Sequence, residues 1–300
     1  MSKGISKVQI GNATLYHGTM EQTIHQINSV NHVLTDPPYL YIKTHYFDQR
    51  FNEKRLFEGV KEMLPDDGFI AMFGRGTSFY RWNTFLAELG FIFKEEIVWD
   101  KRFASAPAMS ISRVHETISI HTKKSGKIRK SKVPYIEQKG HNIDGVINDV
   151  KRIKSAINSE AGLNSILNFL KTGLIPYGKH VGGKNITNSS GLSCQDAACG
   201  TMHFIKDGMR EKTIMPIFPV HYGSVHPTEK PVRLAERILA LISSPGDTIY
   251  DPFMGSGSFG VACIRTGRKY IGSEMKPEYF DIACKRIEEA VNDSPTNNTY

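Results

Sequence analysis

The tetrapeptide Asp36-Pro37-Pro38-Tyr39 brings a carboxylate, a backbone carbonyl and an aromatic ring into one short loop. The two prolines stiffen that loop. The Asp36 carboxylate and the Pro37 carbonyl are hydrogen-bond acceptors, and the Tyr39 ring offers a flat surface for stacking. A planar heterocycle that carries an NH₂ group matches this set, because each acceptor can take one N–H. An ordinary turn would also explain these four residues taken alone.

The glycine-containing segment DPFMGSG at 251–257 is a second candidate site, between a predicted strand and a predicted helix. Glycines allow a tight turn and let a ligand approach backbone N–H groups. Glu274 lies 19 residues beyond Gly255, near the ~20-residue offset at which an acidic side chain binds a ribose in dinucleotide-binding folds. The segment matches neither GxGxxG nor the P-loop, so a nicotinamide or triphosphate ligand fits less well than another ribosyl ligand. A plain strand-to-helix turn is the alternative.

Other residues of chemically active types give weaker signals. Cys194, Cys199 and His203 have the types of zinc ligands, but the spacing supplies no fourth ligand, so we predict no metal site. His115 lies next to a predicted strand and is a candidate for a cleft residue, with a structural role as the alternative.

Alternating strands and helices would position these candidate residues. Residues 31–39 are a short apolar run ended by a double proline, which is typical of a buried parallel strand that delivers Asp36 to its carboxyl end. A predicted helix at 53–68 and a predicted strand at 68–74 complete a parallel crossover. The α/β pattern returns after residue 226, with helices at 229–244, 257–267 and 277–291 and strands at 247–252 and 269–274.

The middle of the chain differs in character from both flanks. Residues 123–132 hold six basic side chains and no acidic one, a helix is predicted over 144–172, and residues 173–225 show no clear period. The predicted organisation is an α/β part at 1–123, an inserted module of helix and loops at 124–225, a second part of the same α/β domain at 226–291, and a frayed tail at 292–300.

Composition limits the class of protein. A chain of 300 residues can bury a core without disulfide or metal support, and 40% hydrophobic with 23% charged residues exclude a largely disordered or collagen-like chain. The excess of 38 basic over 30 acidic residues favours a polyanion partner or an acidic membrane surface. Four scattered cysteines fit a reducing compartment, and no apolar run approaches the roughly 20 residues that span a bilayer. We therefore expect a cytoplasmic protein.

Taken with the segment HPTEKP at 226–231, the two candidate sites resemble those of the amino-group DNA methyltransferases that use S-adenosylmethionine, in the class whose DPPY motif precedes the cofactor loop. The likeness covers about residues 8–123 and 226–290. It includes DPFMGSG, IGSEMKPEYFDIA and the run IVWDKRF to RVHETISIHTKK, and it does not reach the middle module, which carries target recognition in such enzymes. The resemblance implies a Rossmann-like α/β fold in permuted order, in a bacterial or phage-infected cell.

The same resemblance implies roles for particular residues. The target base would be held by Asp36, Pro37, Pro38 and Tyr39. The cofactor would be bound by Thr228, Lys230, Asp251, Pro252, Phe253, Gly255, Ser256, Gly257 and Glu274, with Glu274 at the ribose and Thr228 and Lys230 beside the methionine end. The chain departs from its relatives at His17-Gly18-Thr19, where an acidic residue often follows the glycine.

DNA is the predicted partner, and the basic surplus is consistent with it. Phosphate contacts are predicted for Lys127, Arg129, Lys130 and Lys132, although a charged run is also typical of a solvated surface. The target base must be flipped out of a duplex or already single-stranded to reach such a pocket. A cognate restriction endonuclease and a second copy of the chain are further candidate partners, and the sequence alone chooses neither.

The expected reaction is methylation of the N6 amine of adenine, with the N4 amine of cytosine as the alternative because both bases present the same NH₂ geometry. In this family an Asp before Pro-Pro-Tyr is associated with adenine and a Ser with cytosine. Transfer to cytosine carbon-5 is excluded, because it uses a cysteine that follows a proline and none of the four cysteines does. Methylation of RNA or of a protein glutamine, and DNA binding without catalysis, are the rival hypotheses.

Overall fold

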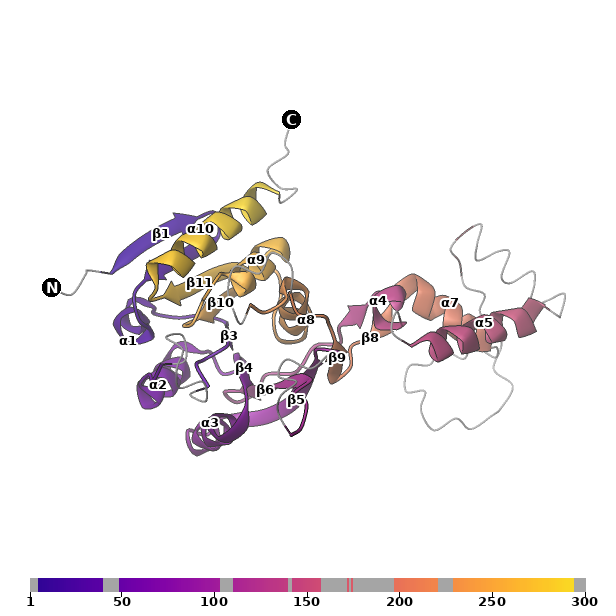
Figure 1. The fold of residues 1–300 in the computed structure, drawn as a ribbon, viewed down its shortest axis with the longest axis horizontal. Helices are drawn as coiled ribbons and strands as arrows, with labels where there is room; N and C mark the ends of the chain where they lie inside the picture. Colours follow the sequence, from indigo (N-terminus) through magenta and orange to yellow (C-terminus); the bar gives the residue numbers. More distant parts are fainter. Residues whose placement is uncertain are drawn as a thin grey trace. The chain divides into compact units, whose positions relative to one another are not determined.

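The computed structural model describes residues 5–39, 49–102, 110–139, 142–157, 172, 174, 197–220 and 229–293 (Figure 1). The chain forms two compact units. Unit 1 comprises Met1–Arg129 and Lys212–Tyr300, and unit 2 comprises Lys130–Glu211. Unit 2 therefore spans fewer residues than the predicted module at 124–225. The predicted tail lies, from residue 294 onward, outside the described residues.

Unit 1 is built on a mixed β-sheet to which nine strands of the described residues contribute, in the order β1-β2-β11-β10-β3-β4-β6-β5-β9. The strands are β1 (Ser6–Ile10), β2 (Ala13–His17), β3 (His32–Thr35), β4 (Phe69–Gly74), β5 (Ile92–Asp100), β6 (His115–Thr122), β9 (Ile214–Pro216), β10 (Thr248–Asp251) and β11 (Lys269–Glu274). The central strands β2, β11, β10, β3 and β4 run parallel. β1 and β6 pair antiparallel with β2 and β4 at either side.

Helices cover both faces of this sheet (Figure 1). They are α1 (Met20–Thr23), the 3₁₀ turn η1 (Ile24–Gln26), α2 (Glu53–Met63), α3 (Gly76–Glu88), α8 (Val232–Ile242), α9 (Ser258–Arg265) and α10 (Pro277–Asn292). The apolar cluster on one face joins α8, α9 and α10 to the sheet, and the cluster on the other joins α1, α2 and α3.

Burial on both faces explains why the central strands are continuous apolar runs. In β4, Phe69, Ala71 and Phe73 belong to one cluster, while Ile70 and Met72 belong to the other. Alternate side chains of a strand point to opposite faces, so a strand covered by helices on both sides needs apolar residues at every position. The predicted crossover from β3 through α2 to β4 and the predicted strands β10 and β11 are confirmed.

The strand order brings the N-terminal and C-terminal parts of unit 1 into one sheet. β10 pairs with β3 through Ile249–His32 and Tyr250–Val33, and β11 pairs with β2 along its length. Both C-terminal strands therefore lie between strands of the N-terminal half. Since the strands are parallel, the loops that follow β3 and β10 leave the sheet at the same edge.

Unit 2 contains a short antiparallel pair, β7 (Lys132–Val133) and β8 (Met209–Arg210), and the helices α4 (Tyr135–Lys139), α5 (Ile143–Ile157) and α7 (Ala197–Asp207). The Tyr135 hydroxyl donates to the buried carboxylate of Asp149 at 2.9 Å, which ties α4 to α5. The part of the predicted 144–172 helix at 158–171 lies outside the described residues, as does Cys194.

Three elements at 173–225, namely α7, β8 and β9, were missing from the sequence prediction. α7 was not predicted because AACGTMHFIKD mixes apolar residues with Gly, Thr and His, which form helices poorly in isolation. β9 was missed because it has only three residues and is stabilised by its parallel pairing with β5, a contact between distant parts of the sequence. β8 has only two residues and is paired with β7, so all three elements depend on contacts with other parts of the sequence.

Candidate functional site

A pocket opens in unit 1 at the carboxyl edge of the parallel strands. Its walls include the loops that follow β2, β3, β10 and β11, together with the start of β6 and the residues that precede α8. Among the predicted site residues, the pocket is lined by Asp36, Pro37, Pro38, Tyr39, Lys230, Asp251, Pro252, Phe253, Gly255, Ser256 and Glu274. The fold therefore brings together residues that are more than 200 positions apart in sequence.

Asp36 follows β3 directly and is held by two side chains. The Tyr39 hydroxyl donates to its Oδ1 at 2.6 Å, and the Lys230 ammonium donates to its Oδ2. The loop is fixed from outside by Ser78, whose hydroxyl donates to the Tyr39 carbonyl at 2.7 Å. Burial raises the pKa of the Asp36 carboxyl, the Lys230 ammonium opposes that shift, and the Glu116 carboxylate adds to it.

Glu116, in β6, completes a line of alternating charges with Asp36. Its Oε1 accepts from Lys101, and its Oε2 lies 3.3 Å from both the Lys230 ammonium and the Tyr39 hydroxyl. Burial alone would raise the pKa of Glu116, but the Lys230 and Lys101 ammonium groups lower it to about 2. The pocket therefore holds two carboxylates bridged by one ammonium group.

The glycine-containing loop begins at Asp251, a side chain only 1% exposed. Asp251 Oδ1 accepts the Phe253 N–H at 3.1 Å, and Oδ2 accepts the Tyr270 hydroxyl at 3.1 Å. Burial raises the pKa of this carboxyl to about 7. Asp251 thus fixes the path of the loop in addition to lining the pocket.

Glu274 at the end of β11 closes the other side of the loop. Its Oε2 accepts the Gly255 N–H at 3.0 Å and its Oε1 accepts the Lys276 N–H at 2.8 Å. Burial raises the pKa of the Glu274 carboxyl. Each carboxylate oxygen has two lone pairs, so capacity remains to accept hydroxyl groups of a ligand in the pocket.

Arg286 of α10 connects the loop to the segment that precedes α8. Its guanidinium donates to the Ser256 carbonyl at 2.9 Å and to the Ser256 hydroxyl at 2.8 Å, and it forms an ion pair with Glu229 at 2.6 Å. Glu229 precedes Lys230, which contacts Asp36. Arg286 was not singled out from the sequence, because one arginine on an amphipathic helix carries no signal of its own.

Of the predicted DNA-contact residues, Lys127 and Arg129 belong to unit 1, and they lie away from this pocket. β6 runs antiparallel to β4, so it begins beside the pocket and ends at Thr122, opposite Phe69 at the start of β4. The basic run therefore starts at the amino edge of the parallel strands. Within it, the Arg129 N–H donates to the Leu241 carbonyl at 2.8 Å.

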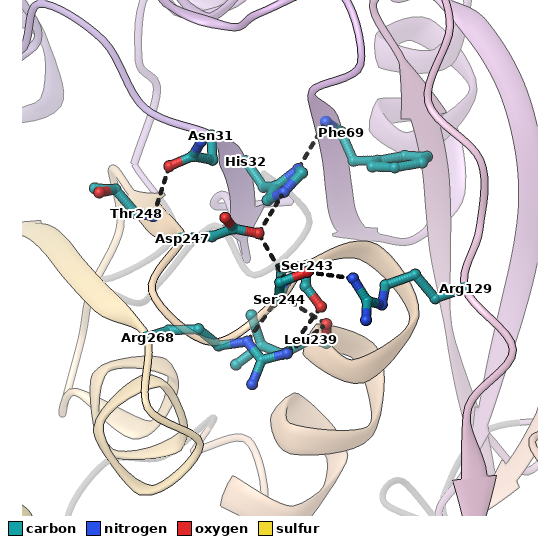
Figure 2. Close-up of polar contacts among 10 residues, drawn as sticks. All are labelled: Asn31, His32, Phe69, Arg129, Leu239, Ser243, Ser244, Asp247, Thr248 and Arg268. Atoms are coloured by element: carbon teal, nitrogen blue, oxygen red, sulfur yellow. Dashed lines mark hydrogen bonds and ion pairs between the residues drawn. The ribbon is translucent and has the colours of Figure 1, made fainter.

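Figure 2 shows the polar network at that amino edge, where the Arg129 guanidinium donates to Ser244. The ring of His32 accepts the Phe69 N–H at 3.1 Å and lies 3.2 Å from Asp247. In unit 2, Lys132 lies 3.9 Å from Asp207. A DNA-binding role for Lys127, Arg129, Lys130 and Lys132 stays a prediction.

Thr228 lies outside the described residues. Gly257 adopts a φ of +81° directly before α9, where a Cβ would lie 2.9 Å from the Ala283 Cβ, so its glycine is needed for packing against α10.

Glu116 was missed, although its neighbour His115 was a candidate. The charge of Glu116 at the end of a predicted buried strand was the signal that could have marked it as a site residue.

The charge of the pocket limits what it can bind. Six acidic side chains line the described wall: Glu21, Asp36, Glu116, Glu229, Asp251 and Glu274. Three basic ones face them: Arg50, Lys230 and Lys276. An acid-rich pocket disfavours a polyphosphate and favours a ligand that carries positive charge. The arrangement can hold such a ligand beside a planar group hydrogen-bonded to Asp36.

The sequence matches the N6/N4 family described as DNA methylase over residues 30–285. Because the match covers most of the chain, this protein belongs to the DNA methylase family.

Two curated relatives match shorter stretches. The Type II methyltransferase M2.DpnII of Streptococcus pneumoniae is 51% identical over 67 residues, 22% of this chain and 25% of the relative. The DNA adenine methyltransferase YhdJ of Escherichia coli strain K12 is 45% identical over 65 residues, 22% of this chain and 22% of the relative. The chain thus covers about a quarter of the length of these relatives.

Solved structures match over almost the whole chain. The M1.HpyAVI–SAM complex gives a TM-score of 0.55 at 20% identity, covering 91% of this chain and 99% of that one. PvuII DNA methyltransferase, described as cytosine-N4-specific, gives 0.56 at 16% identity, covering 95% and 92%. The mixed α/β fold is therefore that of DNA methyltransferase structures.

Proposed function

We propose that this protein transfers a methyl group from S-adenosylmethionine to the N6 amine of adenine in DNA. The observation that carries the proposal is the shared pocket of the DPPY loop and the glycine-containing loop. Family membership supports DNA methylation in general. The relative described as a DNA adenine methyltransferase supports the choice of adenine.

The residues of the pocket fit S-adenosylmethionine. Glu274 would accept the ribose hydroxyls, because its partly buried carboxylate lines the pocket with acceptor capacity left. Gly18 and Thr19, which follow β2, line the same pocket from the other side. The acid-rich wall suits a ligand with a sulfonium and an ammonium group. When bound there, the cofactor supplies a methyl group activated by the positive sulfur.

The Asp36 loop would activate the target amine. An exocyclic amine donates its lone pair into the aromatic ring and is a poor nucleophile. Hydrogen bonds from its two N–H groups to the Asp36 carboxylate and the Pro37 carbonyl favour a more tetrahedral nitrogen, which frees the lone pair for in-line attack. Alignment of this kind contributes up to roughly 7–11 kcal/mol when the reacting groups are held in position.

Cytosine-N4 is the second candidate product, because the PvuII enzyme described as cytosine-N4-specific has the same fold. Both bases present an NH₂ group, with ring N1 of adenine or ring N3 of cytosine beside it. A pocket sized for a purine admits a pyrimidine but holds it loosely. A misaligned cytosine would therefore react slowly.

Mass spectrometry of nucleosides from treated DNA tests the proposal. DNA incubated with the protein and S-adenosylmethionine should yield N6-methyladenine, with at most a trace of N4-methylcytosine. A majority of N4-methylcytosine would overturn adenine as the target. The absence of any methylated nucleoside on several single- and double-stranded DNA substrates would contradict DNA methylation and favour an RNA, protein or non-catalytic role.

Three further features belong to this proposal. We infer a permuted order of the methyltransferase fold, since the cofactor-side strands β10 and β11 come last in the chain but lie in the centre of the sheet. Unit 2 would recognise the target sequence. A restriction endonuclease and a second copy of the chain stay predicted partners.

A further inference from the structure

The Lys230 ammonium lies between two carboxylates in the pocket. Its Nζ donates to Asp36 Oδ2 and lies 3.3 Å from Glu116 Oε2. The side chain of Lys230 is 6% exposed, and those of Asp36 and Glu116 are 18% and 10% exposed. Interactions among charges so poorly hydrated are much stronger than on a protein surface. Lys230 therefore cannot be treated as the partner of Asp36 alone.

A carboxylate paired with one ammonium group is a weaker proton acceptor than a free one, because the positive charge stabilises its ionised form. Glu116 counters this effect, because its negative charge acts on the same ammonium group, 3.3 Å away. Lys101 in turn pairs with the other oxygen of Glu116. The strength of Asp36 as an acceptor thus depends on how the charge of Lys230 is divided.

We propose that Glu116 is a positioning residue that shares Lys230 with Asp36 and so keeps the Asp36 carboxylate a strong acceptor for the target amine. This inference rests on the proposed function. As the nitrogen lone pair forms the N–C bond, the C–S electron pair leaves with sulfur. The nitrogen then carries a positive charge and one surplus proton, and the Asp36 carboxylate accepts that proton.

The hydroxyl of Tyr39 supports the same arrangement. It donates to Asp36 Oδ1 at 2.6 Å and lies within 3.3 Å of Glu116 Oε2, so both carboxylates are anchored to one loop residue. The negative charge of Glu116 also contributes to raising the pKa of Asp36. Geometry and electrostatics therefore point in the same direction.

Glu116→Gln is the direct test, because glutamine keeps the shape and removes the charge. The charge of Glu116 would then no longer compete with Asp36 for the Lys230 ammonium. We expect kcat to fall about tenfold and the acidic limb of the kcat–pH profile to move about one pH unit lower. The affinity for S-adenosylmethionine, measured by calorimetry, should stay near that of the parent. Glu116→Asp, which keeps the charge, should restore part of the profile.

Lys101→Met gives a second test with the opposite sign. It removes the competing ammonium, so Glu116 would act on Lys230 and Asp36 with its full charge. The acidic limb should move to higher pH. Glu96→Gln is the matched control for Glu116→Gln, since Glu96 is an exposed carboxylate on β5, and we expect its kcat–pH profile to equal that of the parent.

Assaying the parent protein beside the variants distinguishes a failure of the Glu116 inference from a failure of the proposed function. If the parent methylates DNA but Glu116→Gln and Lys101→Met leave the acidic limb in place, the role of Glu116 is overturned and the proposed function stands. A lower kcat with an unmoved limb would also overturn it, because it would indicate only a structural effect. If the parent forms no methylated nucleoside, both proposals fail. If Glu116→Gln does not fold, the Lys101→Met shift decides.

Discussion

At the scale of single residues, the site combines groups whose ionisation is set by burial. Asp36 follows β3 and Asp251 is the last residue of β10, so both lie at the same edge of the sheet, and burial raises the pKa of each carboxyl. Each accepts a tyrosine hydroxyl, but Asp36 is also paired with an ammonium group, whereas Asp251 also accepts a backbone N–H. Asp36 is thereby kept available for charge-dependent chemistry, while Asp251 holds its loop in place.

Asp36→Asn should abolish most methyl transfer while cofactor binding survives. Asparagine keeps the size of the side chain but loses the charge that accepts the amine and its proton, so we expect kcat to fall about 100-fold or more. Calorimetry with S-adenosylmethionine and a tritium-transfer assay would measure the two effects separately. Asp67→Asn, at an exposed position before β4, is the charge-matched control. Activity within about tenfold of the parent would remove Asp36 from the assigned role.

At the scale of elements, the loop between β10 and α9 has two glycines with different tasks. Gly255 has a φ of +55°, lines the pocket and donates its N–H to Glu274. Gly257 faces α10, where a Cβ would lie 2.9 Å from the Ala283 Cβ. The first glycine should matter most for the ligand and the second for packing.

Substitutions at these glycines should therefore separate binding from stability. Gly255→Val should remove S-adenosylmethionine binding, because a branched side chain enters the ligand space and strains a positive φ. Gly257→Ala should lower the melting temperature through its overlap with Ala283, equivalent to about 1–3 kcal/mol. Gly90→Ala measures the destabilisation from a positive φ alone, since a Cβ there meets nothing within 4 Å. Equal melting shifts for Gly257→Ala and Gly90→Ala would contradict the packing role.

Elements with strong local patterns were predictable from the sequence, and contacts between distant elements were not. The spacing of apolar residues indicated α2, α8 and the buried strands, because each buries a regular face. The pairing of β3 with β10 placed Asp36 beside the glycine-containing loop, and only the family resemblance anticipated it. Glu116 reached the site through the antiparallel register of β6 on β4, which pairs Thr117 with Gly74. No local pattern encodes that register.

The basic run after β6 can be tested as an element. Changing Lys127, Arg129 and Lys130 to Gln should weaken DNA binding and flatten the plot of log affinity against log salt by about 0.9 for each phosphate that the protein no longer neutralises. Fluorescence anisotropy with a labelled duplex at several salt concentrations measures that slope. An unchanged slope would mean that this run, which starts at the edge opposite Asp36, is a solvated surface.

At the scale of the whole molecule, buried titratable groups give opposing contributions to stability. Burial lowers the pKa of His121 to about 4 from 6.5, so the unfolded chain binds protons before the folded one as the pH falls. Asp251 acts in the opposite sense, because burial raises its pKa to about 7 from 3.8. The stability due to Asp251 is present at low pH and is lost as the pH rises toward 7. The parent should therefore show a shallow pH profile.

Removing one of these groups should expose the contribution of the other. The His121 ring is 2% exposed and packs edge-on against Phe93 at 5.4 Å between ring centroids. Its neutral form contributes fully above about pH 6.5, and this contribution is lost progressively as the pH falls to about 4, up to about 3 kcal/mol.

His121→Gln should therefore destabilise the protein at pH 7 but lose less further stability between pH 7 and pH 5 than the parent. Urea unfolding at several pH values measures both slopes, and the exposed His25→Gln controls for loss of a histidine. Parallel parent and His121→Gln profiles would show that His121 does not titrate differently in the folded and unfolded chains. A profile for His121→Gln that rises toward pH 5 would further indicate that protonation of the carboxyls whose pKa burial raises, Asp36, Asp251 and Glu274, dominates once this histidine is gone.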